Sequence, residues 1–422
     1  MERGYRTFDQ DPIPMEDITE NLTRQDGKPL VGEALEESLG SVDSLPSDNS
    51  RALVLTEITD IFFDSDLLYL AKRFGEKAVD STEGIKQKSE KAKTLSRIAS
   101  TFTEHDFRSI SDKVFEKAMK EAESIKDEAK RVEVFLYVIE DLIENGLKKK
   151  AEKNLDKVLS TSVDLAEKEH DMVPLAMTAE TIAKVDNKKG EETCKKVLEY
   201  LHNLDPVDDR GWIIISLAKA FSRIGRHEKS IELVKKLICA GDSDIQFVEL
   251  GITLSDEGQV ERALELRNHV KNEELRDTLT GKIASDLILK GSVEEALKLM
   301  EDIEDVFETD VILKKLVKHF AGRDRKKARK HLQEISSIEM KALAYRELAI
   351  SHLYKDDHKR AKELALKAIE MIANSESESV KVELIETMID LGLKDRAFEL
   401  AEQIETSEER AIAFGSIAAR TY

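Results

Sequence analysis

Apolar residues recur along this chain at helical spacing, and the recurrence itself repeats. Spacings of three and four put apolar side chains on one face of a helix. A turn residue follows, and a second apolar stripe begins with a small residue five positions later. Each copy therefore predicts two helices joined by a tight turn, where Gly takes a left-handed conformation. One copy consists of Phe135, Val138, Ile139, Leu142, Gly146, Ala151, Leu155 and Val158.

The turn residues make the period countable. They lie about 40 residues apart as far as Gly225 and about 33 apart beyond it. We therefore expect an all-α chain with about ten two-helix repeats. The early repeats are longer by nearly two helical turns, so we expect longer helices in the N-terminal half. The turn positions are Asp66, Asp106, Gly146, Asp186, Gly225, Gly258, Gly291, Asp324, Asp356 and Gly392.

Prolines separate the first 50 residues from the rest. Four of the six prolines lie there, and proline breaks helices. The segment is acidic and poor in apolar residues, which favours disorder in isolation. We expect an extended, low-structure arm over residues 1–50, with one or two helical turns between Val31 and Leu39, and with a partner-binding role if it is ordered. The remaining domains are predicted as a long-repeat half at 51–209, a short-repeat half at 210–405 and a capping helix at 406–422.

The short repeats carry residues that resemble the tetratricopeptide repeat family. The resemblance extends over residues 51–405 and is closest between 211 and 404. Two features depart from the family: no proline lies near the end of each repeat, and the 40-residue units are longer. The resemblance implies a right-handed α-solenoid whose first helices line a binding face for peptides or proteins. The matching residues are Leu250, Gly251, Gly258, Ala263, Tyr345, Leu348, Ala349, Ala361 and Ala368.

Composition narrows the classes of partner. The net charge of −20 argues against a surface that coats DNA or an anionic membrane, and it is compatible with basic protein partners. Abundant Lys and Glu with few Asn and Gln are typical of thermophilic proteins. We expect Cys194 and Cys239 to be small buried hydrophobes. The sequence shows no secretory leader and no membrane-length apolar run, so we expect a cytoplasmic protein.

Motifs for catalysis and for metal binding are missing from the sequence. It contains no GxGxxG, GxxxxGK[ST], HExxH or GxSxG. The run Asp356-Asp357-His358 could hold a cation, but it lies in a repeat turn, where polar residues are expected. We therefore expect no enzymatic activity, no cofactor and no metal.

Basic residues cluster in two successive repeats of this acidic chain. One interpretation is a pair of solvated faces, balanced by the acidic run from Glu294 to Asp310. The other is a site for phosphates or an acidic peptide. Because aromatic residues are few here, any nucleic-acid contact should be to the backbone rather than to bases. The candidates are Lys314, Lys318, Arg323, Arg325, Lys326, Lys327, Arg329 and Lys330, followed by Lys359 and Arg360.

Two further regions are candidates for contacts. Trp212, the only tryptophan, is either an interface anchor or part of the core. It begins a helix that also carries three cations, Lys219, Arg223 and Arg226. The last helix has apolar residues on more than one face, so its outer side is a candidate homodimer edge. The residues of that edge are Ile412, Phe414 and Ile417.

Three functions fit these features. The first is a non-enzymatic scaffold for protein–protein interaction. The second is a ribosome-associated factor of the hibernation or dimerisation type, with acidic faces against ribosomal proteins and the basic cluster against RNA phosphates. The third is an enzyme with a dispersed site that the sequence does not reveal.

Overall fold

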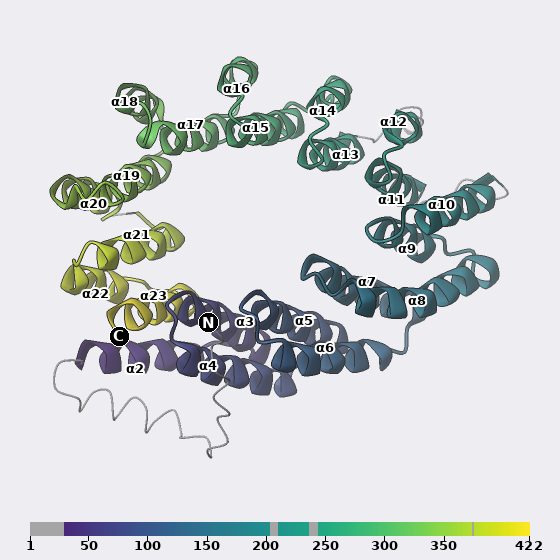
Figure 1. Cartoon of the computed structure of the whole chain (residues 1–422), viewed down its shortest axis with the longest axis horizontal. Coiled ribbons are helices and arrows are strands. Elements are labelled where there is room, and N and C mark those ends of the chain that lie inside the picture. Colours follow the sequence, from purple (N-terminus) through teal and green to yellow (C-terminus); the bar gives the residue numbers. More distant parts are fainter. Residues whose placement is uncertain (1–28, 203–209, 236–243, 374) are drawn as a thin grey trace, which may run out of the picture. The chain divides into compact units, whose positions relative to one another are not determined.

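The computed structural model describes residues 29–202, 210–235, 244–373 and 375–422, and within them the chain is an all-α solenoid (Figure 1). Ten hairpins follow one another along the chain, each with a first helix, a tight turn and a second helix. The first helices are α3 (Asp48–Asp64), α5 (Lys88–Glu104), α7 (Glu128–Glu144), α9 (Val173–Ala183), α11 (Arg210–Arg223), α13 (Asp244–Asp256), α15 (Glu273–Lys290), α17 (Val306–Ala321), α19 (Ile338–Leu353) and α21 (Glu378–Asp390). The predicted ten repeats are confirmed.

The second helices carry the change in repeat length. The early ones, α6 to α10, are 16, 21 and 16 residues long, whereas α12 to α18 have only 8 to 10. First helices do not follow this trend, since α15 has 18 residues and α7 has 17. The predicted lengthening therefore falls mainly on one helix of each pair. The second helices are α4 (Leu68–Ser81), α6 (Arg108–Glu123), α8 (Lys148–Lys168), α10 (Asn187–His202), α12 (His227–Lys235), α14 (Val260–Arg267), α16 (Val293–Met300), α18 (Arg325–Glu334), α20 (His358–Ile372) and α22 (Lys394–Glu402).

The turn glycines adopt the left-handed conformation that the sequence predicts, and three of the five turn aspartates share it. The five turn glycines have φ between 71° and 87°, and Asp66, Asp106 and Asp356 have φ between 56° and 65°. Asp186 and Asp324 instead cap the second helix, because their carboxylates accept backbone N–H bonds from Lys189 and from Lys326 and Lys327. A short polar side chain therefore serves either role at this position.

A carboxylate near the start of several first helices connects successive repeats. Asp244, Asp277 and Asp310 recur every 33 residues, and each accepts two backbone N–H groups at the entrance to the next first helix. For Asp310 the donors are Ser336 and Ser337, at 2.9 and 2.6 Å. The exposed fraction of the Asp310 side chain is only 1%. These contacts satisfy helix N-termini that would otherwise lack partners, and we did not predict them.

The chain folds into two compact units, and one of them combines its two ends. The larger unit is Thr82–Glu376, which holds η1 (Thr82–Gly84) and the helices from α5 to α20. The other joins the described residues up to Ser81 with Ser377–Tyr422. It contains α2 (Pro29–Asp43), α3, α4, α21, α22 and α23 (Ser407–Thr421). The predicted domain boundaries at 209 and 405 do not coincide with these units.

The first and last described helices form a repeat together. α2 packs along α23 as second helices pack on first helices elsewhere, and α23 also contacts α21 and α3 (Figure 1). Ser38 donates a hydrogen bond to the Ala411 carbonyl at 2.8 Å, and Arg410 pairs with Glu37 at 2.8 Å. Ser44, near the end of α2, bonds Ser407, at the start of α23. The two helices are therefore antiparallel, as in a hairpin.

This composite repeat corrects the prediction of an extended arm over residues 1–50. Residues 29–43 are helical, because Val31, Ala34, Leu35 and Val42 lie at helical spacing and are 0 to 1% exposed. Pro29 stands at the first position of the helix, where its missing N–H costs nothing. Residues 1–28 of the predicted arm lie outside the described residues, and its last three residues, 48–50, belong to α3.

The same repeat corrects the predicted dimer edge on α23. Phe414 and Ile417 are fully buried, and only Ile412 of the three is partly exposed. α2 and α3 of the same chain pack on this helix. Gly415 permits the close approach, because a Cβ there would lie 3.1 Å from the Ile58 side chain on α3. The apolar face is thus used within one chain.

Two further observations concern the chain as a whole. Cys194 is buried, as predicted, and burial raises the pKa of its thiol to about 12; Cys239 lies outside the described residues. Among the residues that the structure describes, no helix is both long and apolar enough to cross a membrane.

Candidate interaction surfaces

The three cations predicted around α11 take part in contacts between repeats. Lys219 pairs with Glu249 of α13 at 2.6 Å. Arg223 lies 3.8 Å from Glu180 of α9, and Arg226 lies 3.5 Å from Glu191 of α10. Burial raises the pKa of the Glu180 carboxyl, while Lys219 and Arg223 oppose that shift. These cations therefore join successive repeats.

Trp212 behaves differently from its neighbours on α11. Its side chain is 52% exposed, so it is not a core residue. Ile245 occupies the equivalent position in the next repeat, at the start of α13, and is 53% exposed. Two large apolar side chains thus meet solvent at the same level of successive repeats. We call this pair the apolar edge.

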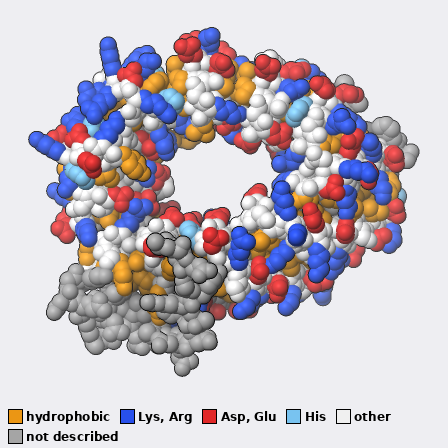
Figure 2. All heavy atoms as spheres, viewed as in Figure 1, with side chains coloured by type: hydrophobic (Ala, Val, Ile, Leu, Met, Phe, Trp, Pro, Cys, Tyr) orange, Lys and Arg blue, Asp and Glu red, His pale blue; other side chains and the backbone are white. Residues whose placement is uncertain are grey.

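The two predicted basic clusters are neighbours in space. Lys355, in the turn after α19, donates a hydrogen bond of 2.9 Å to the carbonyl of Gly322, at the end of α17. The pKa of Asp357, next to α20, is lowered mainly by its hydrogen bond with His352. The positive charge of Arg325, on α18, also helps to lower it. Figure 2 shows Lys and Arg side chains gathered over this region, near the labels α18 and α20 of Figure 1. We define the basic surface as Arg323, Arg325, Lys326, Lys327, Arg329, Lys330, Lys355, Lys359 and Arg360.

Several cations of the basic surface have no carboxylate partner. Lys330 and Arg360 pair with Glu334 and Glu363 of their own helices. Lys327 lies over the Phe320 ring, and Arg323 bonds His319. No other described residue forms an ion pair with the remaining exposed cations on helices, which are Arg325, Lys326, Arg329 and Lys359.

The earlier second helices show the opposite arrangement. Ion pairs between repeats connect α6 with α8, α8 with α10, α12 with α14, and α14 with the turn after α16. Between α18 and either α16 or α20, the described residues form no such pair. Exposed pairs stabilise a fold weakly, but they neutralise its surface, and this neutralisation ends before the basic surface. The pairs are Lys150–Asp112, Lys157–Glu123, Lys189–Asp156, Lys235–Glu265, Arg262–Glu228 and Arg267–Asp302.

The other two predicted cations of this region lie on α17. Lys318 is exposed and lies 3.6 Å from Glu347 of α19, whose side chain is only 14% exposed. Lys314 is half-buried. Both belong to a first helix, whereas most of the basic surface lies on second helices and turns.

Tyr354 is a residue that the sequence pattern did not single out. It follows α19 directly, precedes Lys355 of the basic surface, and its side chain is 86% exposed. The signal was its position, two residues before a turn. Several earlier repeats have charged residues there, among them Glu144, Lys184 and Arg223, and the repeat of Gly291 has Leu289, which is 78% exposed. An apolar residue at this position is therefore exposed rather than buried.

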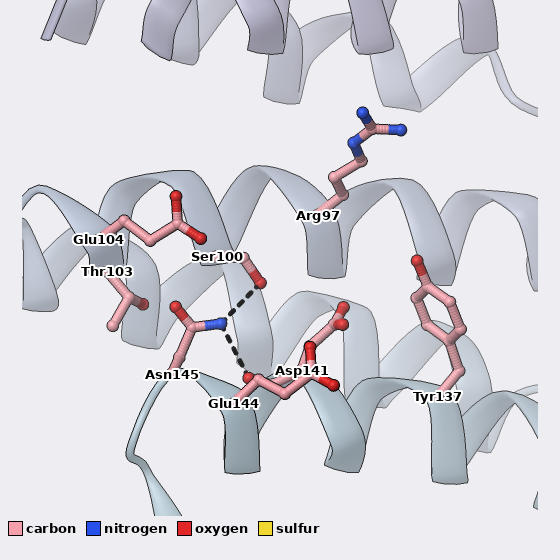
Figure 3. A pocket seen from close by; sticks show the side chains of 8 residues that line it. All are labelled: Arg97, Ser100, Thr103, Glu104, Tyr137, Asp141, Glu144 and Asn145. Carbon is pink, nitrogen blue, oxygen red and sulfur yellow. Dashed lines mark hydrogen bonds between the residues drawn. The ribbon is translucent and has the colours of Figure 1, made fainter. Parts of the chain in front are cut away.

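An open recess of about 490 Å³ lies between α5 and α7 (Figure 3). Asn145 spans it, donating to the Ser100 hydroxyl at 3.0 Å and to the Asp141 carbonyl at 2.8 Å. Ser96 donates to the Asp141 carboxylate at 2.6 Å. Burial raises the pKa of Asp141 to about 6, against the effect of that hydrogen bond. The polar side chains that line the recess form hydrogen bonds between the two repeats. We therefore assign the recess to repeat packing.

No cluster of three His, Cys, Asp or Glu side chains able to hold a metal ion occurs in the described part of the chain. At the Asp356-Asp357-His358 turn, Asp357 contacts His352 at 2.8 Å and accepts the backbone N–H of Arg360. Its carboxylate therefore caps α20.

Comparison with known proteins finds distant structural likeness only. No protein-family model matches the chain, and no curated protein gives a significant match. The crystal structure of Ton1535 from Thermococcus onnurineus NA1 is 15% identical, with a TM-score of 0.32, and the alignment covers 89% of this chain and 98% of that one. The human IFIT1 dimer with m7Gppp-AAAA is 13% identical, with a TM-score of 0.27, and 95% and 99% are covered. A circular tandem repeat protein is 14% identical, with a TM-score of 0.24, and 86% and 84% are covered.

Proposed function

We propose that this chain is a non-enzymatic helical-repeat scaffold that binds a partner protein. The apolar edge carries this proposal, because Trp212 and Ile245 are large, exposed and set on consecutive repeats. Aromatic residues on rigid elements are frequent hot spots of protein interfaces. Asp141 and Glu180, whose pKa values burial raises, contact residues of neighbouring repeats. We therefore assign them to repeat packing and not to proton transfer.

A pull-down from a lysate of the native source tests the scaffold. The double variant Trp212→Ala, Ile245→Glu should lose the proteins that the unaltered chain retains. Leu68→Glu is the control, since Leu68 is 48% exposed at the start of α4. The proposal fails if the double variant retains the same proteins, or if the unaltered chain retains none.

A second candidate is a factor that docks on a ribonucleoprotein such as a ribosomal subunit. The unpaired cations of the basic surface favour it, because lysine and arginine contacts to phosphates position proteins on RNA. Sucrose-gradient sedimentation at low and high salt, with and without RNase, is the test. The chain should sediment with particles at low salt and leave them at high salt or after RNase. Sedimentation as a free protein at low salt would contradict this candidate.

A further inference from the structure

The basic surface has the composition of a nucleic-acid interface more than that of a protein interface. Protein interfaces have cores depleted of charge, whereas nucleic-acid interfaces are strongly positive. The large exposed apolar residues on α17 and α19 are Val306 and Phe307, at the start of α17, and Ile338, at the start of α19. α17 has 16 residues, so its two ends are about 24 Å apart. Tyr354 lies at the end where the cations gather.

The cations are available to phosphates. Arg325, Lys326 and Arg329 are exposed on the first turns of α18, and Lys359 is exposed on α20. Asp324 already occupies the backbone N–H groups at the start of α18. An incoming anion would therefore meet side chains and not the helix terminus. Lys355 donates one hydrogen bond to Gly322, and an ammonium group has three donors.

Tyr354 provides an aromatic ring, which can stack on a base but does not bind a phosphate. Its ring is almost fully exposed and is adjacent in sequence to Lys355. Positive surfaces that bind single strands combine cations along the backbone with aromatic rings on which bases stack. Such stacking needs an unpaired base, and it tolerates any base because every base has a flat face.

We infer that the basic surface binds single-stranded nucleic acid, with its lysines and arginines on the phosphates and Tyr354 stacked on one base. This inference rests on the second candidate function and deepens it. It also revises the expectation from the sequence that contacts would be to the backbone alone. RNA and DNA share this chemistry, and the binding measurement separates them.

The test is fluorescence anisotropy with labelled 12-nucleotide RNA and DNA of mixed sequence, and with the duplex of the same length. Poly-glutamate serves as a purely anionic competitor. We expect the full chain to bind either single strand, or both, more tightly than the duplex, with affinity that falls as salt rises. Tyr354→Ala should weaken binding about tenfold, and Tyr354→Phe should bind like the unaltered chain.

Charge reversal provides the second arm. The triple variant Arg325→Glu, Lys326→Glu, Arg329→Glu should lose binding. The matched control reverses Lys148, Lys149 and Lys153 of α8, which are also exposed cations on the first turns of a second helix, and should retain binding. Circular dichroism confirms that each variant is folded.

Three outcomes would overturn the inference. The first is equal affinity for the duplex together with no effect of Tyr354→Ala. The second is full competition by poly-glutamate at equal charge, which would indicate an acidic protein. The third is no binding of either strand by the folded chain. If the chain then still sediments with particles, the second candidate function stands and only the nucleic-acid contact is wrong.

Discussion

At the scale of single residues, carboxylates determine how the repeats meet. Asp277 and Asp310 are buried and Asp244 is partly exposed, and each accepts two backbone N–H groups at the start of the next repeat. Asp141 is also largely buried, but it accepts a side-chain hydrogen bond from Ser96 and lies near Glu140 and Glu144. The same residue type therefore serves two purposes: Asp310 accepts backbone N–H groups of the next repeat, whereas burial favours the protonated form of Asp141.

Asp141 should make stability depend on pH. Its pKa in the folded chain is about 6, above the ordinary value near 3.8, so the folded state holds this proton more tightly than the unfolded chain. The resulting stabilisation is complete below about pH 4 and is lost as pH rises through 6. Asp141→Asn should raise the free energy of unfolding at pH 8 by about 3 kcal/mol and change it little at pH 4.

Urea unfolding at several pH values measures this effect. Arg97, which lines the same recess, opposes the rise in the pKa of Asp141. Arg97 must therefore stay unaltered in the variants that are compared. Glu104→Gln, an exposed carboxylate of the recess, is the control for a general loss of negative charge. If both variants gain equally at pH 8, burial of Asp141 is not the cause.

At the scale of elements, packing decides what each helix does. α2 has Val31, Leu35 and Val42 on one face, but the helix that covers this face, α23, is more than 360 residues away in sequence. Phe414 and Ile417 of α23 are also buried, and the Phe414 ring lies 5.1 Å from the Phe398 ring of α22. An apolar stripe in the sequence therefore indicates that a helix face will be covered, and the fold selects the covering segment.

Two glycines test the contact between α23 and its neighbours. A Cβ at Gly415 would lie 3.1 Å from Ile58, whereas a Cβ at Gly40, on α2, would have no neighbour within 4 Å. Gly415→Leu should destabilise the unit by about 1 to 3 kcal/mol through overpacking. Gly40→Leu should be neutral or slightly stabilising, since helix propensity improves. Thermal melts and amide exchange in α23 compare the two, and equal effects would contradict the packing described.

At the scale of the whole chain, the repeat register does not depend on where the termini lie. The end of α23 points toward the start of α2, as the first helix of a hairpin points toward the second. Solenoid stability is a sum over repeats and their neighbours. The composite repeat should therefore tolerate a covalent connection in place of its two ends.

A circular permutant tests this expectation. Tyr422 is joined to Pro29 through a short Gly-containing turn, and new termini are opened at His170, which is exposed between α8 and α9. Permutation succeeds at exposed loops. The reference is the unpermuted chain that starts at residue 29. The permutant should have the same helical circular dichroism as this chain and a melting temperature within a few degrees of it. If the joined chain is unfolded when opened at His170 and also when opened at other exposed loops, the composite hairpin is misassigned.

The sequence by itself determined the repeats. Helical spacing of apolar residues and the glycine at a turn are local properties, so the ten hairpins of the described residues and the five left-handed glycine turns could be predicted from positions such as Gly146 and Gly225. Adjacency of the basic clusters also followed from the period. These features depend on neighbours within one or two repeats.

Only the tertiary structure decided which side chains remain exposed and which ends meet. Lys219 and Arg223 resemble Lys326 and Arg329 in the sequence, yet only the first two form ion pairs with carboxylates of another repeat. Tyr354 and Phe414 are both aromatic residues on or next to helices, yet one is exposed and the other is buried. Pairing and burial depend on residues distant along the chain, and a local pattern contains no information about them.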